Sequence, residues 1–522
     1  MSSSSLSRFW LQTVLGPMLA GLVYSGAFAP LSLWPLVFVG LTWLLCCLRG
    51  LTAYEARRAG FLFGLVVTCI GCLWLKNIFG WTFLLLCAFQ SLFWGVFGWG
   101  HAIIDRQPWN GWRKMLAVAC AWTGIEFIRA EHFWLDFPWL TPGHGLGVIQ
   151  LVTQPLLSWV GVYGVGFVVI CVCWWLRPVM AGLGRAVRWQ VEGRRGLSLG
   201  GLVVAAMTMF IILDMLAVML PLVQGAWRGV NQKAAGMQNQ GLPTISFVAV
   251  QDEHGSLDHF MEMTGGVPDK PDLVLWPEEA LPYDVSRSKR DWPRLLEFVK
   301  QKNCVLVLGT QETATAGKGW RNTALALDAK GELGRHYKMH PVHLFDDGIP
   351  GTEAKPVVTR LGKIGTPICF DCDYQDVVRT MTLKGAEWFA VPSMDPIAWG
   401  PVERQMHSVL FRIRAAENGR AMVVAATSGV TQVIDGWGHN VLLRKEDGTR
   451  VNDGVLPIIE PGVLTGRLPV RSGLTFFTLW GWMFPWLALG GGAVGIGVRE
   501  RRGAGEARDC SQDPSDASFP VG

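Results

Sequence analysis

Hydrophobic and polar positions divide the chain into two kinds of sequence. Residues 1–221 and 475–498 consist mainly of apolar runs with short polar loops between them, whereas residues 222–470 mix apolar and polar positions as water-soluble domains do. A membrane-spanning helix needs about 20 mostly apolar residues. The apolar runs therefore predict a polytopic α-helical membrane domain of about eight spans, near residues 9–28, 31–48, 58–79, 82–104, 112–128, 155–176, 198–221 and 475–498.

The loops between the predicted spans indicate their orientation. Arg and Lys gather after the second, fourth, sixth and eighth spans, and the alternate loops carry few of them. Because basic loops stay in the cytoplasm, we expect both termini there and residues 222–470 on the outer face. The first span is similar to a signal peptide, but Pro30 and a second apolar run follow it without a convincing cleavage site, so an uncleaved helical hairpin is predicted.

Four regions follow from these patterns. Residues 1–221 form the membrane domain with seven helices, 222–470 a globular domain, 471–498 the eighth membrane helix, and 499–522 a disordered cytoplasmic tail rich in Gly, Ser, Asp and Pro. Only 17% of the 522 residues are charged and 50% are hydrophobic, which excludes a disordered chain. The net charge of +5 is spread over short loops rather than gathered in a stripe, so we expect no nucleic-acid partner.

The globular region predicts an α/β fold, because short β-branched runs alternate with helical stretches. The predicted strands are Thr244–Gln251, Asp272–Trp276, Cys304–Gly309, Thr323–Leu327, Ile364–Cys369, Trp388–Val391, Met422–Ala426 and Thr431–Ile434. The predicted helices are Asp258–Gly265, Trp292–Lys302, Gln375–Lys384 and Pro401–Asn418.

Three stretches of this region carry candidate chemistry. Glu278 follows a buried strand, Lys338 ends a hairpin-like stretch, and Cys369 ends a strand before a turn into a helix. Each feature alone is common. A thiol with an ordinary pKa of about 8.5, however, needs a base and a positive neighbour to react as a thiolate at neutral pH. An acid, an amine and a thiol in these settings therefore indicate a cysteine nucleophile with its activating groups.

Other readings of the cysteines are weaker. Cys369 and Cys372 form a C-x-x-C pair, which suggests a redox or zinc site, but no second pair follows and the flanking sequence is not thioredoxin-like. We therefore predict no metal and no cofactor. Cys372 is interpreted as a bystander and Cys304 as a core residue. Most other cysteines lie in or beside apolar runs, so no disulfide framework is expected.

The order of these stretches, WPEE, then YK, then ICFD, resembles the nitrilase, or carbon–nitrogen hydrolase, superfamily. Residues 8–498 as a whole resemble the bacterial apolipoprotein N-acyltransferase family, which places a nitrilase-like domain between its seventh and eighth membrane helices. Further matching stretches are Phe28–Pro35, Phe137–Trp139, Gly161–Gly164, Arg412–Arg420 and Trp480–Trp486. The resemblance implies an αββα sandwich for the globular domain.

The resemblance also implies roles for individual residues. Glu278 is expected to be the general base, Lys338 the cationic stabiliser and Cys369 the nucleophile, with an oxyanion bound by backbone N–H near Phe370. The family's Cys-Tyr-Glu is Cys-Phe-Asp here, so Phe370 and Asp371 are departures from the pattern. A second family Glu is replaced by Asp346 or Asp347, and the sequence does not decide which.

The implied reaction moves an acyl chain from a phospholipid to Cys369 as a thioester. The chain then passes to the α-amino group of the N-terminal diacylglyceryl-cysteine of an apolipoprotein. We accordingly expect a monomeric enzyme in the bacterial inner membrane with its catalytic domain in the periplasm. Two alternatives stay open: a membrane-anchored nitrilase-type amidase or hydrolase with water as acceptor, and a polytopic protein, such as a transporter, that carries a degenerate domain.

Overall fold

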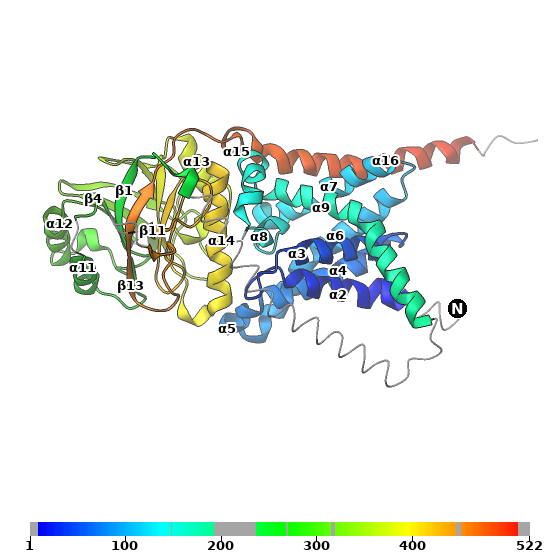
Figure 1. The fold of residues 1–522 in the computed structure, drawn as a ribbon, viewed down its shortest axis with the longest axis horizontal. Coiled ribbons are helices and arrows are strands. Elements are labelled where there is room, and N and C mark those ends of the chain that lie inside the picture. Colours follow the sequence, from blue (N-terminus) through cyan, green and yellow to red (C-terminus); the bar gives the residue numbers. More distant parts are fainter. Residues whose placement is uncertain are drawn as a thin grey trace, which may run out of the picture.

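The computed structural model describes residues 9–147, 149–192, 236–267, 270–314, 319–444 and 450–509. Their secondary structure falls into a helical part and an α/β part that lie end to end (Figure 1). The seventh predicted span, residues 198–221, lies outside the described residues.

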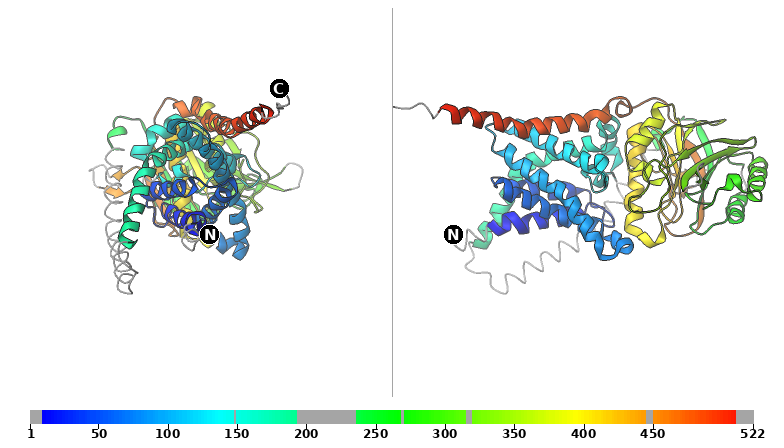
Figure 2. Two further views of the ribbon diagram at one scale, coloured as in Figure 1. Left: turned by 90° about the vertical axis from the view of Figure 1, so that its right-hand side faces the viewer. Right: turned by 180° about the vertical axis from the view of Figure 1, so that it is seen from behind.

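The helical part consists of a bundle of apolar helices. Helix α16 runs along one side of it beside α7, as Figures 1 and 2 show. α9 contains a kink at Gly161, whose φ is +70°. The helices are α2 (Gly16–Ser25), α3 (Pro35–Leu48), α4 (Ala53–Gly71), α5 (Lys76–Phe79), α6 (Phe83–Asp105), α7 (Gly111–Phe127), α8 (Pro142–Gly145), α9 (Gln150–Glu192), α15 (Phe476–Leu479) and α16 (Phe484–Asp509).

Glycines allow α4 and α6 to pack with their backbones in contact. A Cβ at Gly60 would lie 2.1 Å from the carbonyl oxygen of Trp94, and a Cβ at Gly98 would lie 2.1 Å from that of Ala56. Small residues at helix contacts are typical of bundles that pack in lipid. Any larger residue at either position would push the two helices apart.

Helices occupy seven of the eight predicted spans, but their lengths vary. Within the described chain, two helical stretches are long and apolar enough to cross a membrane, Leu73–Asp105 and Thr153–Gly182, and two shorter apolar helices are Leu11–Ser25 and Pro35–Leu48. α16 continues to Asp509, past residue 498, where the disordered tail was predicted to begin. Helix length alone therefore does not give the predicted number of spans.

Two β-sheets face each other in the α/β part. One has the strand order β13-β1-β2-β3-β4-β5 and the other β10-β9-β8-β7-β6. The strands are β1 (Thr244–Gln251), β2 (Leu273–Leu275), β3 (Val305–Thr313), β4 (Trp320–Asp328), β5 (Gly331–Tyr337), β6 (Val357–Thr359), β7 (Gly362–Gly365), β8 (Trp388–Ser393), β9 (Met422–Ala426), β10 (Gln432–Ile434) and β13 (Gly462–Pro469), with the small pair β11 (Leu443–Arg444) and β12 (Arg450–Asn452).

Alternation along the strands builds an αββα sandwich. On β1, Phe247 and Ala249 pack between the sheets with residues such as Trp388 of β8, whereas Val248 and Val250 face the outer helices. Helices α11 (Leu257–Gly265) and α12 (Asp291–Lys302) cover one outer face. Helices α13 (Asp376–Leu383) and α14 (Pro401–Asn418) cover the other. α14 stands between the sheets and the helical part (Figure 2), so this outer face is buried between the two parts of the molecule.

Candidate active site

Glu278 lies in a tight loop after β2 and is completely buried. Its backbone N–H donates to the carbonyl oxygen of Ser393, on the facing sheet, at 3.4 Å. Gly309 on the neighbouring strand makes room for this loop, because a Cβ there would lie 2.4 Å from the carbonyl oxygen of Pro277. The carboxylate is thus fixed at the end of the sheet.

Lys338 follows β5 and reaches the same place. Its Nζ lies 2.9 Å from Oε1 of Glu278 and 2.7 Å from Oδ2 of Asp347. The side-chain amide of Asn322, on β4, donates to Glu278 at 2.7 Å and to Asp347 at 2.9 Å. One ammonium group is therefore held between two carboxylates, and one amide joins both acids.

The two candidate acids after Lys338 occupy different environments. Asp347 is buried, and its Oδ2 accepts a hydrogen bond from the backbone N–H of Val342 at 2.8 Å. Asp346 is exposed and has no hydrogen bond to Lys338. Of the two, Asp347 is the acid that contacts the amine.

Cys369 begins a 3₁₀ turn, Cys369–Cys372, with a backbone φ of +46°. The predicted strand Ile364–Cys369 is too long: β7 ends at Gly365, since Pro367 has no N–H for a strand ladder. A positive φ is unusual for a residue other than glycine and is found at nucleophile turns and similar functional sites. The Sγ atom lies 3.6 Å from the carbonyl oxygen of Met394.

Electrostatics couple these three groups. Burial raises the pKa of Glu278 to about 7, although the Lys338 ammonium opposes this rise. Burial and the Glu278 carboxylate also raise the pKa of the Cys369 thiol well above its ordinary value, again against Lys338. Burial opposes protonation of Lys338, but Glu278 and Cys369 raise its pKa well above normal. At neutral pH the resting site therefore holds a thiol, an ammonium group and a carboxyl group that titrates.

Asp371 connects the amine-bearing loop to the cysteine turn. Burial opposes its ionisation, but the hydrogen bond and charge of His336 hold its pKa below the ordinary value. It accepts hydrogen bonds of 2.9–3.0 Å from Nε2 of His336 and from the backbone N–H groups of Met339, His340 and Ile368. Asp371 thus positions the segments that carry Lys338 and Cys369.

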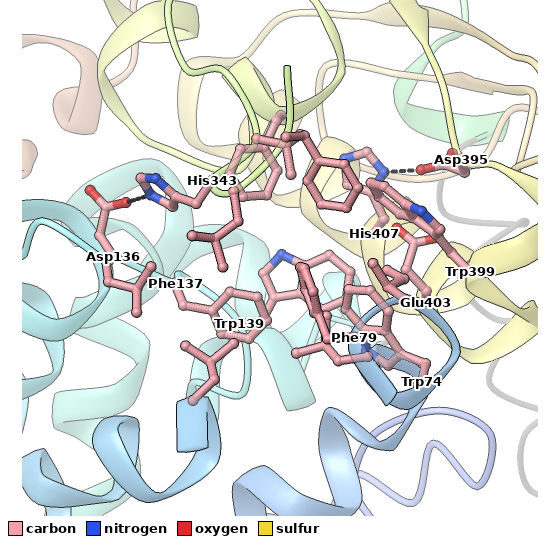
Figure 3. Close-up of a pocket in the computed structure, with 18 of the residues that line it drawn as sticks. Trp74, Phe79, Asp136, Phe137, Trp139, His343, Asp395, Trp399, Glu403 and His407 are labelled. Atoms are coloured by element: carbon pink, nitrogen blue, oxygen red, sulfur yellow. Dashed lines mark hydrogen bonds and ion pairs between the residues drawn. The ribbon is translucent and has the colours of Figure 1, made fainter. Parts of the chain in front are cut away.

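An apolar pocket lined by both parts of the molecule opens onto Cys369. Figure 3 shows side chains that line it, among them Trp74, Phe79 and Trp139. Cys369 and Phe370 line its α/β side. Side chains from the helical part complete it: Trp74, Ile78, Phe79, Leu86, Phe137 and Trp139. The nucleophile candidate therefore faces an apolar space built by both parts of the chain.

The structure adds polar residues that sequence reasoning missed. On the pocket wall, Nδ1 of His407 lies 2.6 Å from Oδ1 of Asp395, and its Nε2 lies 3.1 Å from Oδ1 of Asp373. Trp139 donates its Nε1–H to Asp373 at 2.6 Å. Glu403 lines the same wall and precedes His407 by one helical turn on α14. This i, i+4 spacing is the sequence signal that would have placed both on one helix face.

Cys369, Asp395 and His407 are also the one group among the described residues with metal-ligating atoms close together, within 4.8 Å. Both ring nitrogens of His407 already face carboxylates. Although burial lowers the pKa of His407, these carboxylates raise it well above its ordinary value. Since both ring nitrogens of His407 are already held by carboxylates, we assign no metal here.

The other two cysteines of the globular part lie away from the pocket. Cys372 packs in the core between the second sheet and its helices, and Cys304 packs in the core under α11 and α12. Burial raises the pKa of the Cys372 thiol well above its ordinary value. A buried thiol of this kind is inert.

Comparison with known proteins gives the class of this domain and then the family of the chain. Residues 237–449 match the carbon-nitrogen hydrolase family, so the αββα part is a carbon–nitrogen hydrolase domain. A crystal structure of a carbon-nitrogen hydrolase from Helicobacter pylori G27 covers 43% of this chain and 89% of its own, with 18% identity and a TM-score of 0.36.

Residues 20–175 match a second family, the apolipoprotein N-acyltransferase N-terminal domain. The apolipoprotein N-acyltransferase of Methylococcus capsulatus is 26% identical over 97% of this chain and 99% of its own. That of Geobacter metallireducens is 23% identical over 93% of this chain and 95% of its own. The chain belongs to the apolipoprotein N-acyltransferase family.

Proposed function

We propose that this protein transfers an acyl chain from a phospholipid, through a thioester on Cys369, to the α-amino group of a diacylated apolipoprotein. The observation that carries the proposal is the apolar pocket that ends at Cys369 and is walled by helices of the family's N-terminal domain. Burial of an acyl chain contributes about 0.8 kcal/mol per CH₂ group. A lipid donor therefore gains most where an apolar space meets the nucleophile.

In the first half of the reaction, Glu278 takes the thiol proton and the Cys369 sulfur attacks the ester carbonyl carbon of the donor. Lys338 stabilises the thiolate and then the oxyanion, together with backbone N–H near Phe370. The C–O bond breaks, and Glu278 returns the proton to the departing alcohol oxygen of the lysophospholipid. The pKa of about 7 suits Glu278 to both transfers near neutral pH.

In the second half, the neutral α-amine of the acceptor attacks the thioester carbonyl. A C–N bond forms, the C–S bond breaks, and one amine proton returns to the Cys369 sulfur through Glu278. Asp347 and Asn322 keep the pair of Lys338 and Glu278 in place throughout, because Asp347 binds Lys338 and Asn322 binds both Glu278 and Asp347. No metal or cofactor takes part in this scheme.

The family also supports a location. We propose that the helices of residues 9–192 and α16 span the inner membrane, with the carbon–nitrogen hydrolase domain in the periplasm and both termini in the cytoplasm. The basic loops support this orientation. Exposed tryptophans at helix ends, such as Trp81 and Trp480, and Trp159 beside the α9 kink suit the membrane–water interface. The protein is proposed to act as a monomer.

The test is an assay with purified full-length protein, a phospholipid, and a synthetic diacylated lipopeptide with a free α-amine. We expect the acyl chain on the peptide nitrogen, and no transfer by Cys369→Ala, whereas Cys372→Ala stays active. Release of free fatty acid without N-acylation would overturn the proposal in favour of a hydrolase that uses water.

A further inference from the structure

Glu403 is a buried acid in the wall of the catalytic pocket. It lies in the first turn of α14, with 2% of its surface exposed, and its Oε2 is buried with no hydrogen-bond partner among the described residues. The helix dipole stabilises a carboxylate in a first helical turn, but it does so for an exposed carboxylate too. The dipole therefore does not explain why Glu403 is buried. Its burial beside an apolar pocket therefore calls for a cationic or hydrogen-bonding ligand.

Glu403 lines the same pocket as Cys369. Figure 3 shows Glu403 beside His407 and Trp399 on one wall of the pocket. His407 is bound to Asp395, and the ligating atoms of Cys369, Asp395 and His407 lie within 4.8 Å of one another. A group bound at Glu403 is thus held in the same space as an acyl chain on Cys369.

We propose that Glu403 receives the α-ammonium group of the acceptor and takes one of its protons before the amine attacks. This inference rests on the proposed acyl transfer and concerns its second half. The acceptor's R–NH₃⁺ gives one proton to the Glu403 carboxylate, and the resulting R–NH₂ attacks the thioester carbonyl. A second proton passes through Glu278 to the Cys369 sulfur, and the third stays on the amide nitrogen. Glu403 then releases its proton to solvent.

The charges around Glu403 suit this role. Burial and the Asp395 carboxylate raise its pKa well above the ordinary value, Asp373 adds to this, and His407 and Arg404 oppose it. A carboxyl group with a raised pKa is the stronger base once ionised. The Glu403 carboxyl group binds a cation only after losing its own proton. At pH values where Glu403 is still partly protonated, cation binding should therefore become tighter as the pH rises.

The experiment separates the two halves of the reaction in full-length enzyme. Thioester formation is measured with phospholipid alone. Acceptor binding is measured as competition by a diacylated lipopeptide whose α-nitrogen is trimethylated, so that its positive charge does not titrate. We expect Glu403→Gln to slow thioester formation by a smaller factor than it weakens binding of the cationic competitor. We expect it to bind the cationic competitor about tenfold more weakly, since an interaction with a charged group is lost.

In the unchanged enzyme, affinity for the cationic competitor should increase with pH, and in Glu403→Gln this increase should be smaller. Glu403→Asp, which keeps the carboxylate, should regain part of the increase. Glu297→Gln, on the exposed face of α12, is the matched control and should behave as the unchanged enzyme. Equal competitor affinity in Glu403→Gln at every pH would overturn the inference, as would an equal loss of thioester formation. Failure of the unchanged enzyme to form any thioester would instead overturn the proposed function itself.

Discussion

The Nζ atom of Lys338 lies 2.9 Å from Oε1 of Glu278, and both side chains are buried at the end of the first sheet. Such a pair is expensive to bury unless both charges are fully hydrogen-bonded. Asp347 and Asn322 supply the extra bonds, so the pair is held in one geometry. A fixed cation beside a carboxyl group that titrates near neutral pH is the arrangement from which the proposed chemistry follows.

The first prediction concerns pH. Since only the Glu278 carboxylate accepts the thiol proton and its pKa is about 7, the rate of thioester formation should rise with pH through about 7. Single-turnover acylation by phospholipid measures this rise of the rate with pH. Glu278→Gln should lower the rate by about 10²-fold or more and abolish the rise. An unchanged rise with pH in this variant would show that another group is the base.

The second prediction compares neighbouring acids. Asp347→Asn should slow thioester formation about tenfold or more, because Lys338 loses a buried, charged partner. Asp346→Asn, at an exposed position, should leave the rate unchanged and serves as the matched control. The reverse pattern would mean that the loop rearranges when substrate binds.

The third prediction concerns stability. Asp371→Asn should lower the free energy of unfolding by about 3 kcal/mol, since it breaks a buried pair with His336 and weakens three bonds to backbone N–H groups. Asp376→Asn, which breaks a half-exposed pair with His340, should change it by less than about 1 kcal/mol. Thermal unfolding of the two variants in the same detergent distinguishes them, and similar losses would contradict the role given to Asp371.

The fourth prediction concerns the pocket. Ile78→Trp adds volume to the apolar wall, so turnover of a long-chain phospholipid should fall about tenfold or more while a short-chain ester reacts as before. Leu383→Trp, at an exposed position on α13, is the control for an added indole. If both donors slowed equally, the pocket would not be the site of the acyl chain.

The sequence predicted the elements of the sandwich well where alternation was clean. β1 and α14 have the predicted bounds, because apolar positions recur at the spacing of one buried face. β13 was not predicted, although it pairs with β1 along its whole length. Its pairing joins segments more than 200 residues apart, which local patterns do not reveal.

The candidate site was predicted in part for a similar reason. Glu278, Lys338 and Cys369 stand in recognisable local settings. Glu278 and Lys338 form a 2.9 Å ion pair, and the charges of both act on Cys369. Asp346 and Asp347 are adjacent and have the same sequence setting, so only the path of the loop shows which of them faces Lys338. Glu403 and His407 resemble residues of a solvated helix face until α14 is seen between the two parts of the molecule.

The most direct test of the central claim is mass spectrometry of the purified protein after incubation with phospholipid alone. We predict an acyl group, labile to hydroxylamine, on the peptide that contains Cys369, and its loss in Cys369→Ala. An adduct that survives in this variant, or one that maps to Cys372, would contradict the account.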